Sequence, residues 1–148
     1  MTVMPSMIEF LAGFESRTYP LRALANTSFD TVNITGWSWW TVASVSFILI
    51  NPGAAPAATG NVVIFDSGNR VYASYAVQST GAATAEELSW GLAGGFFGVA
   101  GVGAQQALPW LFNIGEGQVQ WGFAGGAVGT TVSAGFLTII GRQFRNRK

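Results

Sequence analysis

Residues 61–77, NVVIFDSGNRVYASYAV, contain two runs of alternating side chains joined by the turn-forming residues 66–69. Alternation with a period of two is typical of a strand that buries one face. Asp and Asn tolerate a left-handed backbone and Gly adopts it at no steric cost, so this pattern predicts a β-hairpin. Residues 71–77 would keep a single apolar face only if the register shifts near Ala73.

The stretch before the hairpin is also typical of β-structure. Residues 37–50, WSWWTVASVSFILI, are rich in β-branched and aromatic side chains, and Gly36 separates them from a shorter run of the same kind. The alternation is interrupted, which indicates a strand covered on both faces or one that carries a bulge. In a regular strand, Trp37 and Trp39 would share one face and Trp40 would take the other.

Glycine and proline mark the remaining connections. We expect a loop at 51–60, a helical turn at 83–88 and a long glycine-rich loop at 91–107. A turn at 115–117 separates two further strands, and residues 129–140 contain the terminal strand.

Residues 1–30 differ in composition, because they carry more charge than the chain average and are interrupted by proline. Ile8, Leu11 and Phe14 have the spacing of one face of a short helix, which Pro20 would end. We expect this segment to be an arm that docks on a neighbouring subunit.

The whole pattern predicts one all-β domain. A β-sandwich of jelly-roll-like form is expected at 31–141, preceded by the N-terminal arm at 1–30 with its short helix and followed by a basic C-terminal tail at 142–148. A chain of 148 residues is long enough to bury one core. We expect no signal peptide, because the N-terminus lacks a cationic region and Glu9 interrupts its apolar part.

The composition limits the chemistry. Charged residues make up only 9% of the chain, against roughly 25% in soluble domains, and seven cations balance seven anions. No global basic field attracts nucleic acid or anionic membrane, and a surface with so few charges favours coverage by lipid or by protein. Without histidine or cysteine the chain lacks the commonest general base, thiol nucleophile and zinc ligands. We therefore expect no enzyme, no catalytic residues, no cofactor and no metal.

A membrane span is an alternative interpretation of residues 117–141. They carry no charge, are long enough to cross about 30 Å of hydrocarbon, and are followed by cations. Against this, they contain many glycines, each of which costs about 1 kcal/mol in a helix relative to alanine. A strand is therefore the favoured interpretation.

The aromatic and basic residues are the candidates for binding. Trp37 and Trp39 would form either an aromatic platform for sugar, nucleobase or protein, or a core face and a subunit interface, which we favour. The tail cations Arg142, Arg145 and Arg147 are solvated or dock on an acidic protein surface, whereas nucleic-acid contact is the least favoured interpretation.

Several segments in order, VASVSFILI, NVVIFDSGNRVYASY, LPWLFNIGEGQVQW and TTVSAGFLTII, resemble the small β-sandwich virion proteins of tailed bacteriophages. The resemblance covers about residues 37–141 and is a pattern of strands and turns. It implies a capsid decoration (cement) protein, a homotrimer that binds the major capsid protein on the head shell and is made in the host cytoplasm. No catalytic residue is carried over. The expected interface residues are Ile8, Leu11, Phe14, Trp37, Trp39, Trp110, Phe112, Arg142, Arg145 and Arg147.

Three other functions fit the same sequence. A tail, neck or fibre-base protein of a phage would differ only in its partner. A carbohydrate-binding module would expose Trp37 or Trp39. A small membrane protein would use 117–141 as its span. For the favoured virion protein we expect no small-molecule substrate.

Overall fold

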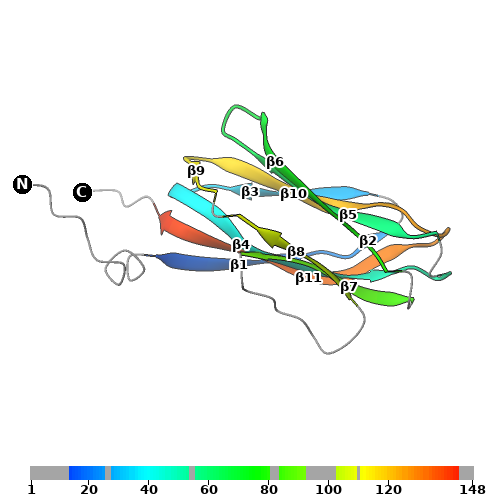
Figure 1. The fold of residues 1–148 in the computed structure, drawn as a ribbon. Helices are drawn as coiled ribbons and strands as arrows, with labels where there is room; N and C mark the ends of the chain where they lie inside the picture. The colour runs from blue at the N-terminus through cyan, green and yellow to red at the C-terminus, as the bar shows by residue number, and fades with distance from the viewer. Residues whose placement is uncertain are drawn as a thin grey trace, which may run out of the picture.

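The computed structural model describes residues 14–25, 28–53, 56–80, 84–92, 103–109 and 111–143. Every regular element within these ranges is a β-strand, and the strands form two sheets that face each other (Figure 1). The predicted all-β sandwich is thereby confirmed at the level of fold class. The expected helix in the arm, with Ile8 and Leu11, lies outside the described residues.

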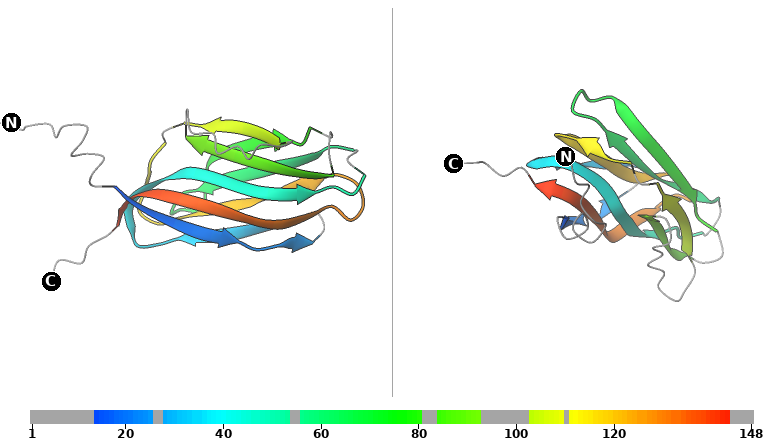
Figure 2. Two further views of the ribbon diagram at one scale, coloured as in Figure 1. Left: turned by 90° about the horizontal axis from the view of Figure 1, so that it is seen from below. Right: turned by 60° about the vertical axis from the view of Figure 1, so that its left-hand side comes forward.

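The larger sheet, sheet A, has seven strands, and the order of five of them is β1-β11-β4-β7-β8 (Figure 2, left). Its members are β1 (Glu15–Leu21), β2 (Leu24–Ala25), β4 (Trp37–Ile50), β7 (Ala85–Leu92), β8 (Gly103–Leu108), β9 (Asn113–Ile114) and β11 (Thr131–Gln143). The short strand β2 pairs with β11, and β9 pairs with the beginning of β4.

The smaller sheet, sheet B, has four strands in the order β3-β10-β5-β6. They are β3 (Phe29–Ile34), β10 (Gly117–Gly125), β5 (Ala58–Phe65) and β6 (Val71–Gln78). The antiparallel pairs are nested along the chain: β5–β6 is innermost, followed by β4–β7, β3–β10 and β1–β11. Among the described strands only β7 and β8 pair in parallel.

The β5–β6 hairpin confirms the strongest prediction from the sequence. Asn69 donates its backbone N–H to the Asp66 carbonyl at 3.0 Å and has a φ of 59°, so Asn69 rather than Gly68 takes the left-handed position. Opposite Ile64 and Phe65 the register shifts, which leaves Tyr72 as the extra residue, one position from the predicted shift at Ala73.

Two bulges in β4 change the faces of its tryptophans. The ladder to β11 passes from Trp37 to Trp39 in one step and from Val42 to Ser44 in another, so Ser38 and Ala43 are extra residues. Because each bulge adds one residue, the buried side chains on its two sides are three positions apart, as in Val42 and Val45. Trp37 and Trp40 are consequently both buried, and Trp39 is half-buried. The prediction that Trp37 and Trp39 share a face was wrong, and a bulge was one of the two explanations that the sequence left open for the interrupted alternation.

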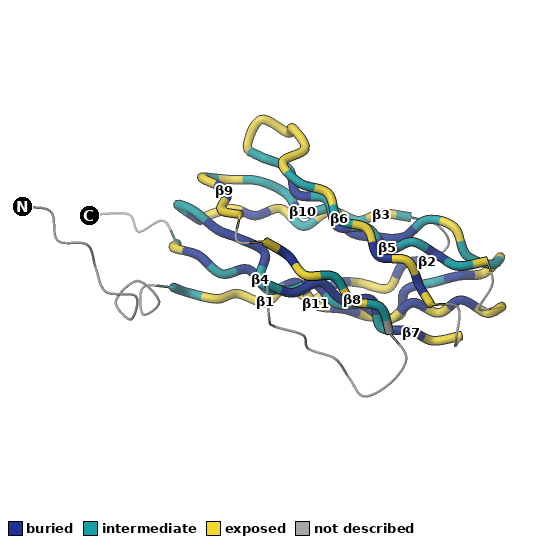
Figure 3. The backbone as a smooth tube through the Cα atoms, viewed as in Figure 1, coloured by how far each residue is buried: buried dark blue, intermediate teal, exposed yellow. Residues whose placement is uncertain are grey.

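A single aromatic and aliphatic core fills the space between the sheets (Figure 3). Phe47 and Trp90 of sheet A and Trp121 of sheet B lie at its centre, with 5.4 Å between the Phe47 ring and each indole. Gly60 in sheet B packs directly against core side chains of sheet A, since an added Cβ would lie 2.6 Å from Leu88 and 2.9 Å from Trp90. The loop predicted at 51–60 ends earlier than expected, because β5 begins at Ala58.

Three further boundaries differ from the prediction. Residues 15–21 form an edge strand of sheet A rather than part of an arm, and Pro20 is tolerated there because only one side of β1 is paired. Most of the expected helical turn at 83–88 belongs to β7, and the end of the expected loop at 91–107 forms β8. In each case pairing with a distant strand outweighs the local composition.

Residues 117–141 form most of two strands in different sheets, β10 and β11, joined by a turn at 126–130. The interpretation as strands is thus confirmed over the interpretation as a single span. No helix in the described part of the chain has the length and apolar character needed to cross a membrane.

Candidate functional site

One end of the sandwich gathers several of the side chains that the sequence singled out. Strands β1 and β4 begin there and β11 ends there, because Glu15 pairs with Gly141 and Trp37 with Gln143 (Figure 1). The strand β9 and the tip of the β5–β6 hairpin lie at the same end. We call the surface formed by Phe14, Trp39, Tyr72, Leu111, Phe112 and Ile114 the terminal face.

Three aromatic rings form the base of the terminal face. The Trp39 ring lies between Phe14, at 5.0 Å and 74°, and Phe112, at 5.2 Å and 88°. Both contacts are edge-to-face, the arrangement that places the positive edge of one ring against the negative face of the next. Tyr72 donates its hydroxyl hydrogen to the Phe112 carbonyl at 3.1 Å, which links the hairpin to this group.

The apolar side chains around these rings are exposed. Ile114 is 83% exposed, and Leu111, Phe112 and Tyr72 are each about two-fifths exposed (40%, 38% and 42%). Exposed apolar side chains are ordinary singly, but a contiguous group of them is typical of a protein interface.

The framework below the exposed side chains is fixed by burial. Asn113 is buried and pairs with Trp40 across the β4–β9 ladder, and the Trp40 indole N–H donates to the Gly115 carbonyl at 2.9 Å. Ile114, which lies between Asn113 and Gly115 in the chain, pairs with Trp39 and points outward. The two-residue strand β9 therefore holds Ile114 at the surface.

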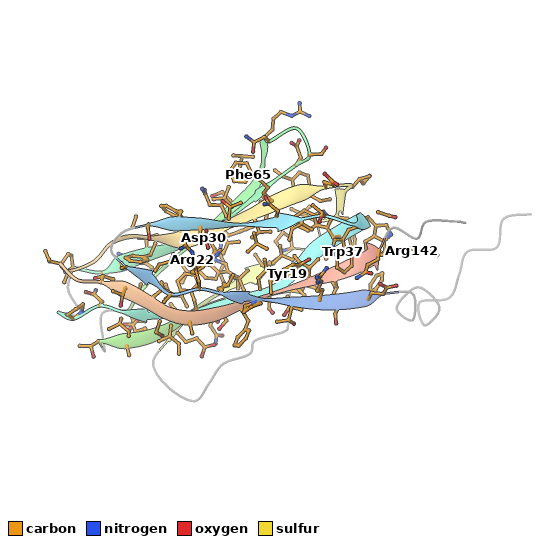
Figure 4. All side chains as sticks on the ribbon, turned by 180° about the vertical axis from the view of Figure 1, so that it is seen from behind. Tyr19, Arg22, Asp30, Trp37, Phe65 and Arg142 are labelled. Atoms are coloured by element: carbon orange, nitrogen blue, oxygen red, sulfur yellow. The ribbon has the colours of Figure 1, made fainter. Side chains whose placement is uncertain are left out.

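The ten predicted interface residues separate into three groups. The structure brings Phe14, Trp39 and Phe112 together. It places the exposed Arg142, labelled in Figure 4, opposite Trp39 in the β4–β11 ladder. Trp37 is buried at 2% exposure, so it cannot be an aromatic platform. The positions Ile8, Leu11, Trp110, Arg145 and Arg147 lie outside the described residues.

Sequence reasoning missed Tyr72, Leu111 and Ile114. Tyr72 was not identified because its outward direction depends on the bulge in β6. Ile114 could have been suspected, since it directly precedes the turn at 115–117, where an apolar residue has little cover.

A second apolar area lies on the outer face of sheet A. Phe136 is 60% exposed and Ile48 43% exposed, and between them a hollow of ≈ 260 Å³ is also lined by Ala134 and Gly135. Glu87, at the rim, accepts a hydrogen bond from the Ser46 hydroxyl at 2.8 Å. This face is a further surface on which protein could pack.

Charges contribute little in the described part of the chain. Two ion pairs are present there, Arg22–Asp30 at 2.7 Å and Arg70–Asp66 at 3.3 Å, and both are solvated. The hydrogen bond from Arg22 lowers the pKa of Asp30, and the backbone N–H of Arg70 lowers the pKa of Asp66. Within the described residues, no three His, Cys, Asp or Glu side chains gather as a metal site would require.

No protein-family model matches this chain, and no curated protein matches it by sequence.

Proposed function

We propose that this protein is a structural component of a bacteriophage particle, a capsid decoration (cement) protein that binds the head shell as a symmetric homotrimer. The observation that carries the proposal is the terminal face, where a rigid framework displays exposed apolar side chains from the hairpin, from 111–112 and from β9. Apolar, aromatic-rich patches with few charges are typical of the centres of protein interfaces.

The fold supports this proposal. The nested pairs β5–β6, β4–β7, β3–β10 and β1–β11, divided between two sheets, are the order that a jelly roll requires. Jelly rolls occur in viral capsid proteins and in lectins, so the order favours a particle protein without by itself establishing one.

The two apolar surfaces suggest a division of contacts. We assign the terminal face to the shell, because the described chain begins and ends there, at the points from which the predicted arm and basic tail continue. The apolar area around Phe136 on sheet A would then pack against other copies. Three-fold symmetry would strengthen individually modest contacts through avidity.

A matched pair of variants tests the assignment. Ile114→Asp places a carboxylate on the terminal face, and Val128→Asp places one at the fully exposed loop tip of the other end. Both should change the free energy of unfolding by less than about 0.5 kcal/mol. We expect Ile114→Asp to weaken binding to shells lacking the protein at least about tenfold, measured by co-sedimentation, and Val128→Asp to bind like wild type.

Light-scattering mass on the purified protein should give three chains. A monomer that fails to bind shells would contradict the proposal. Electron microscopy of labelled particles distinguishes the head location from a tail, neck or fibre-base location, which would use the same surface with a different partner.

A further inference from the structure

The outer face of sheet B differs from the other surfaces in its chemistry. Its outward positions alternate with the buried Val119, Trp121 and Val62, and they carry amide, hydroxyl or uncharged apolar side chains. The register places Gln118 between Asn33 and Phe65. The next row contains Thr31, Gln120, Val63 and Ser74. We call this surface, whose outward positions on the four strands carry no charge, the amide face.

A pocket of ≈ 470 Å³ lies at one end of the amide face. Asn33 and Gln118 line it from the sheet, Asp66 and Asn69 from the hairpin turn, and Glu116 from the turn before β10. Every residue that lines it except Gly117 carries a hydrogen-bonding side chain. The volume falls within the about 300–1,000 Å³ usual for small-molecule sites.

The walls of the pocket are held in place by the fold. Asp66 accepts hydrogen bonds from the backbone N–H groups of Gly68 and Arg70, both at 2.9 Å, which fixes the hairpin turn. Gly117 lies so close to its neighbours that an added Cβ would come within 2.7 Å of the Trp40 ring. Prearranged polar groups on rigid elements lose little freedom on binding a ligand.

The polar groups of the pocket select the class of ligand. Amide side chains both donate and accept hydrogen bonds, and the Glu116 carboxylate only accepts them. Among the described residues, no lysine or arginine lines the pocket, and Asp66 is already paired with Arg70. An anionic ligand would find no cation in the pocket to compensate its charge, whereas neighbouring hydroxyl groups match amides and a carboxylate in both donors and acceptors.

We propose that this pocket binds a neutral oligosaccharide, one of whose sugar rings occupies the pocket while the chain continues along the amide face past Gln120 and Asn61. Phe65, which Figure 4 shows at the base of the hairpin, lies beside Gln118 and offers an apolar surface to the C–H groups of a sugar. Glycan binding goes beyond the structural role proposed above and does not depend on it.

Nuclear magnetic resonance on the ¹⁵N-labelled full chain tests the site. The probes are neutral tetrasaccharides built from glucose, mannose, galactose or N-acetylglucosamine, with 3′-sialyllactose and calcium chloride alone as comparisons. We expect at least one neutral probe to shift the side-chain amide signals of Asn33, Asn69 and Gln118 in a saturable manner. Sialyllactose and calcium should leave these signals in place.

Two variants locate the contact. Gln118→Ala and Asn33→Ala should each raise the dissociation constant of the binding probe about tenfold, as expected for a lost hydrogen bond. Gln105→Ala, which removes an exposed amide from β8 in the other sheet, is the matched control and should bind like wild type. The same spectra report whether each variant is folded.

Three results would overturn the inference. The first is the absence of shifts with every neutral probe up to about 10 mM, a concentration above the range of weak specific sites. The second is a response to calcium or sialyllactose alone. The third is unchanged affinity in folded Gln118→Ala and Asn33→Ala.

Discussion

The two ends of the sandwich differ in the contacts that their side chains make. At the end away from the chain termini, the buried Asn51 joins its own loop to the turn at 126–130: its amide N–H donates to the Pro56 carbonyl at 2.9 Å, and its side-chain oxygen accepts from the Ala127 backbone at 3.0 Å and from the Thr130 hydroxyl at 3.2 Å. Nearby, the buried Glu86 accepts hydrogen bonds from the backbone and the hydroxyl of Thr80.

The terminal face, by contrast, is held by ring contacts and leaves apolar side chains in solvent. Exposed apolar side chains occur at the far end too, at Phe29 and at the loop tip of Val128, but that end is closed by internal hydrogen bonds. The difference fits the proposal that the far end serves stability and the terminal face serves association. The following variants test this division, from the largest expected effect to the smallest.

Asn51→Ala should destabilise the protein by about 3 kcal/mol, because it removes three side-chain hydrogen bonds of a buried residue and leaves the Pro56 carbonyl and the Ala127 N–H without this partner. Chemical denaturation measures the loss. Asn61→Ala is the matched control, since the half-buried Asn61 makes one long bond to the Thr59 carbonyl at 3.3 Å and should cost less than about 0.5 kcal/mol. Equal effects of the two substitutions would show that the Asn51 network does not close the far end.

Trp40→Phe should cost about 2 kcal/mol, because the Gly115 carbonyl loses its indole partner and the ring leaves a space. Trp121 is equally buried, yet no described residue accepts a hydrogen bond from its N–H, so Trp121→Phe should cost about 1 kcal/mol less. Binding to the head shell, as proposed above, adds a second readout. Loss of the bond to Gly115 should loosen β9 and weaken this binding in Trp40→Phe but not in Trp121→Phe. Equal losses in stability would mean that the bond to Gly115 does not fix the terminal face.

The sequence predicted the parts of the fold that are local. The β5–β6 hairpin, the bulged strand at 37–50 and the last two strands carry their own alternation and turn residues. The strands β1 and β8 do not: β1 contains Pro20, and β8 follows a glycine-rich run. They are strands because β11 and β7 offer partners that are distant in the chain.

The sites were less predictable for a related reason. Bulges at Ser38 and Ala43 decide which tryptophans enter the core, and nothing in the order of residues marks their positions. The pocket on sheet B unites the end of β3, the hairpin turn and the residues before β10. The order of the strands in the sheet decides which of these segments meet. The alternating pattern of side chains does not reveal that order.

Asn69→Ala should destabilise the hairpin by about 1 kcal/mol, since alanine lacks the tolerance of asparagine for the left-handed backbone at φ 59°. Asn69→Gly should equal or exceed wild type in thermal stability, because glycine adopts this conformation freely. The pair distinguishes backbone strain from the loss of the Asn69 side chain. If both variants were equally destabilised, the side chain rather than the turn geometry would support the hairpin at the terminal end.

Asp30→Asn should have the smallest effect, because its ion pair with Arg22 is solvated (Figure 4). The Arg22 hydrogen bond lowers the pKa of Asp30 in the folded state below the unfolded value of about 3.9. The pair therefore stabilises the fold above that value, by less than about 1 kcal/mol, and the contribution is lost as the pH falls through the folded pKa. Denaturation curves of wild type and variant should differ near neutral pH, converge in acid, and differ less in high salt. A difference that persists at acid pH would assign the effect to packing at the far end instead of charge.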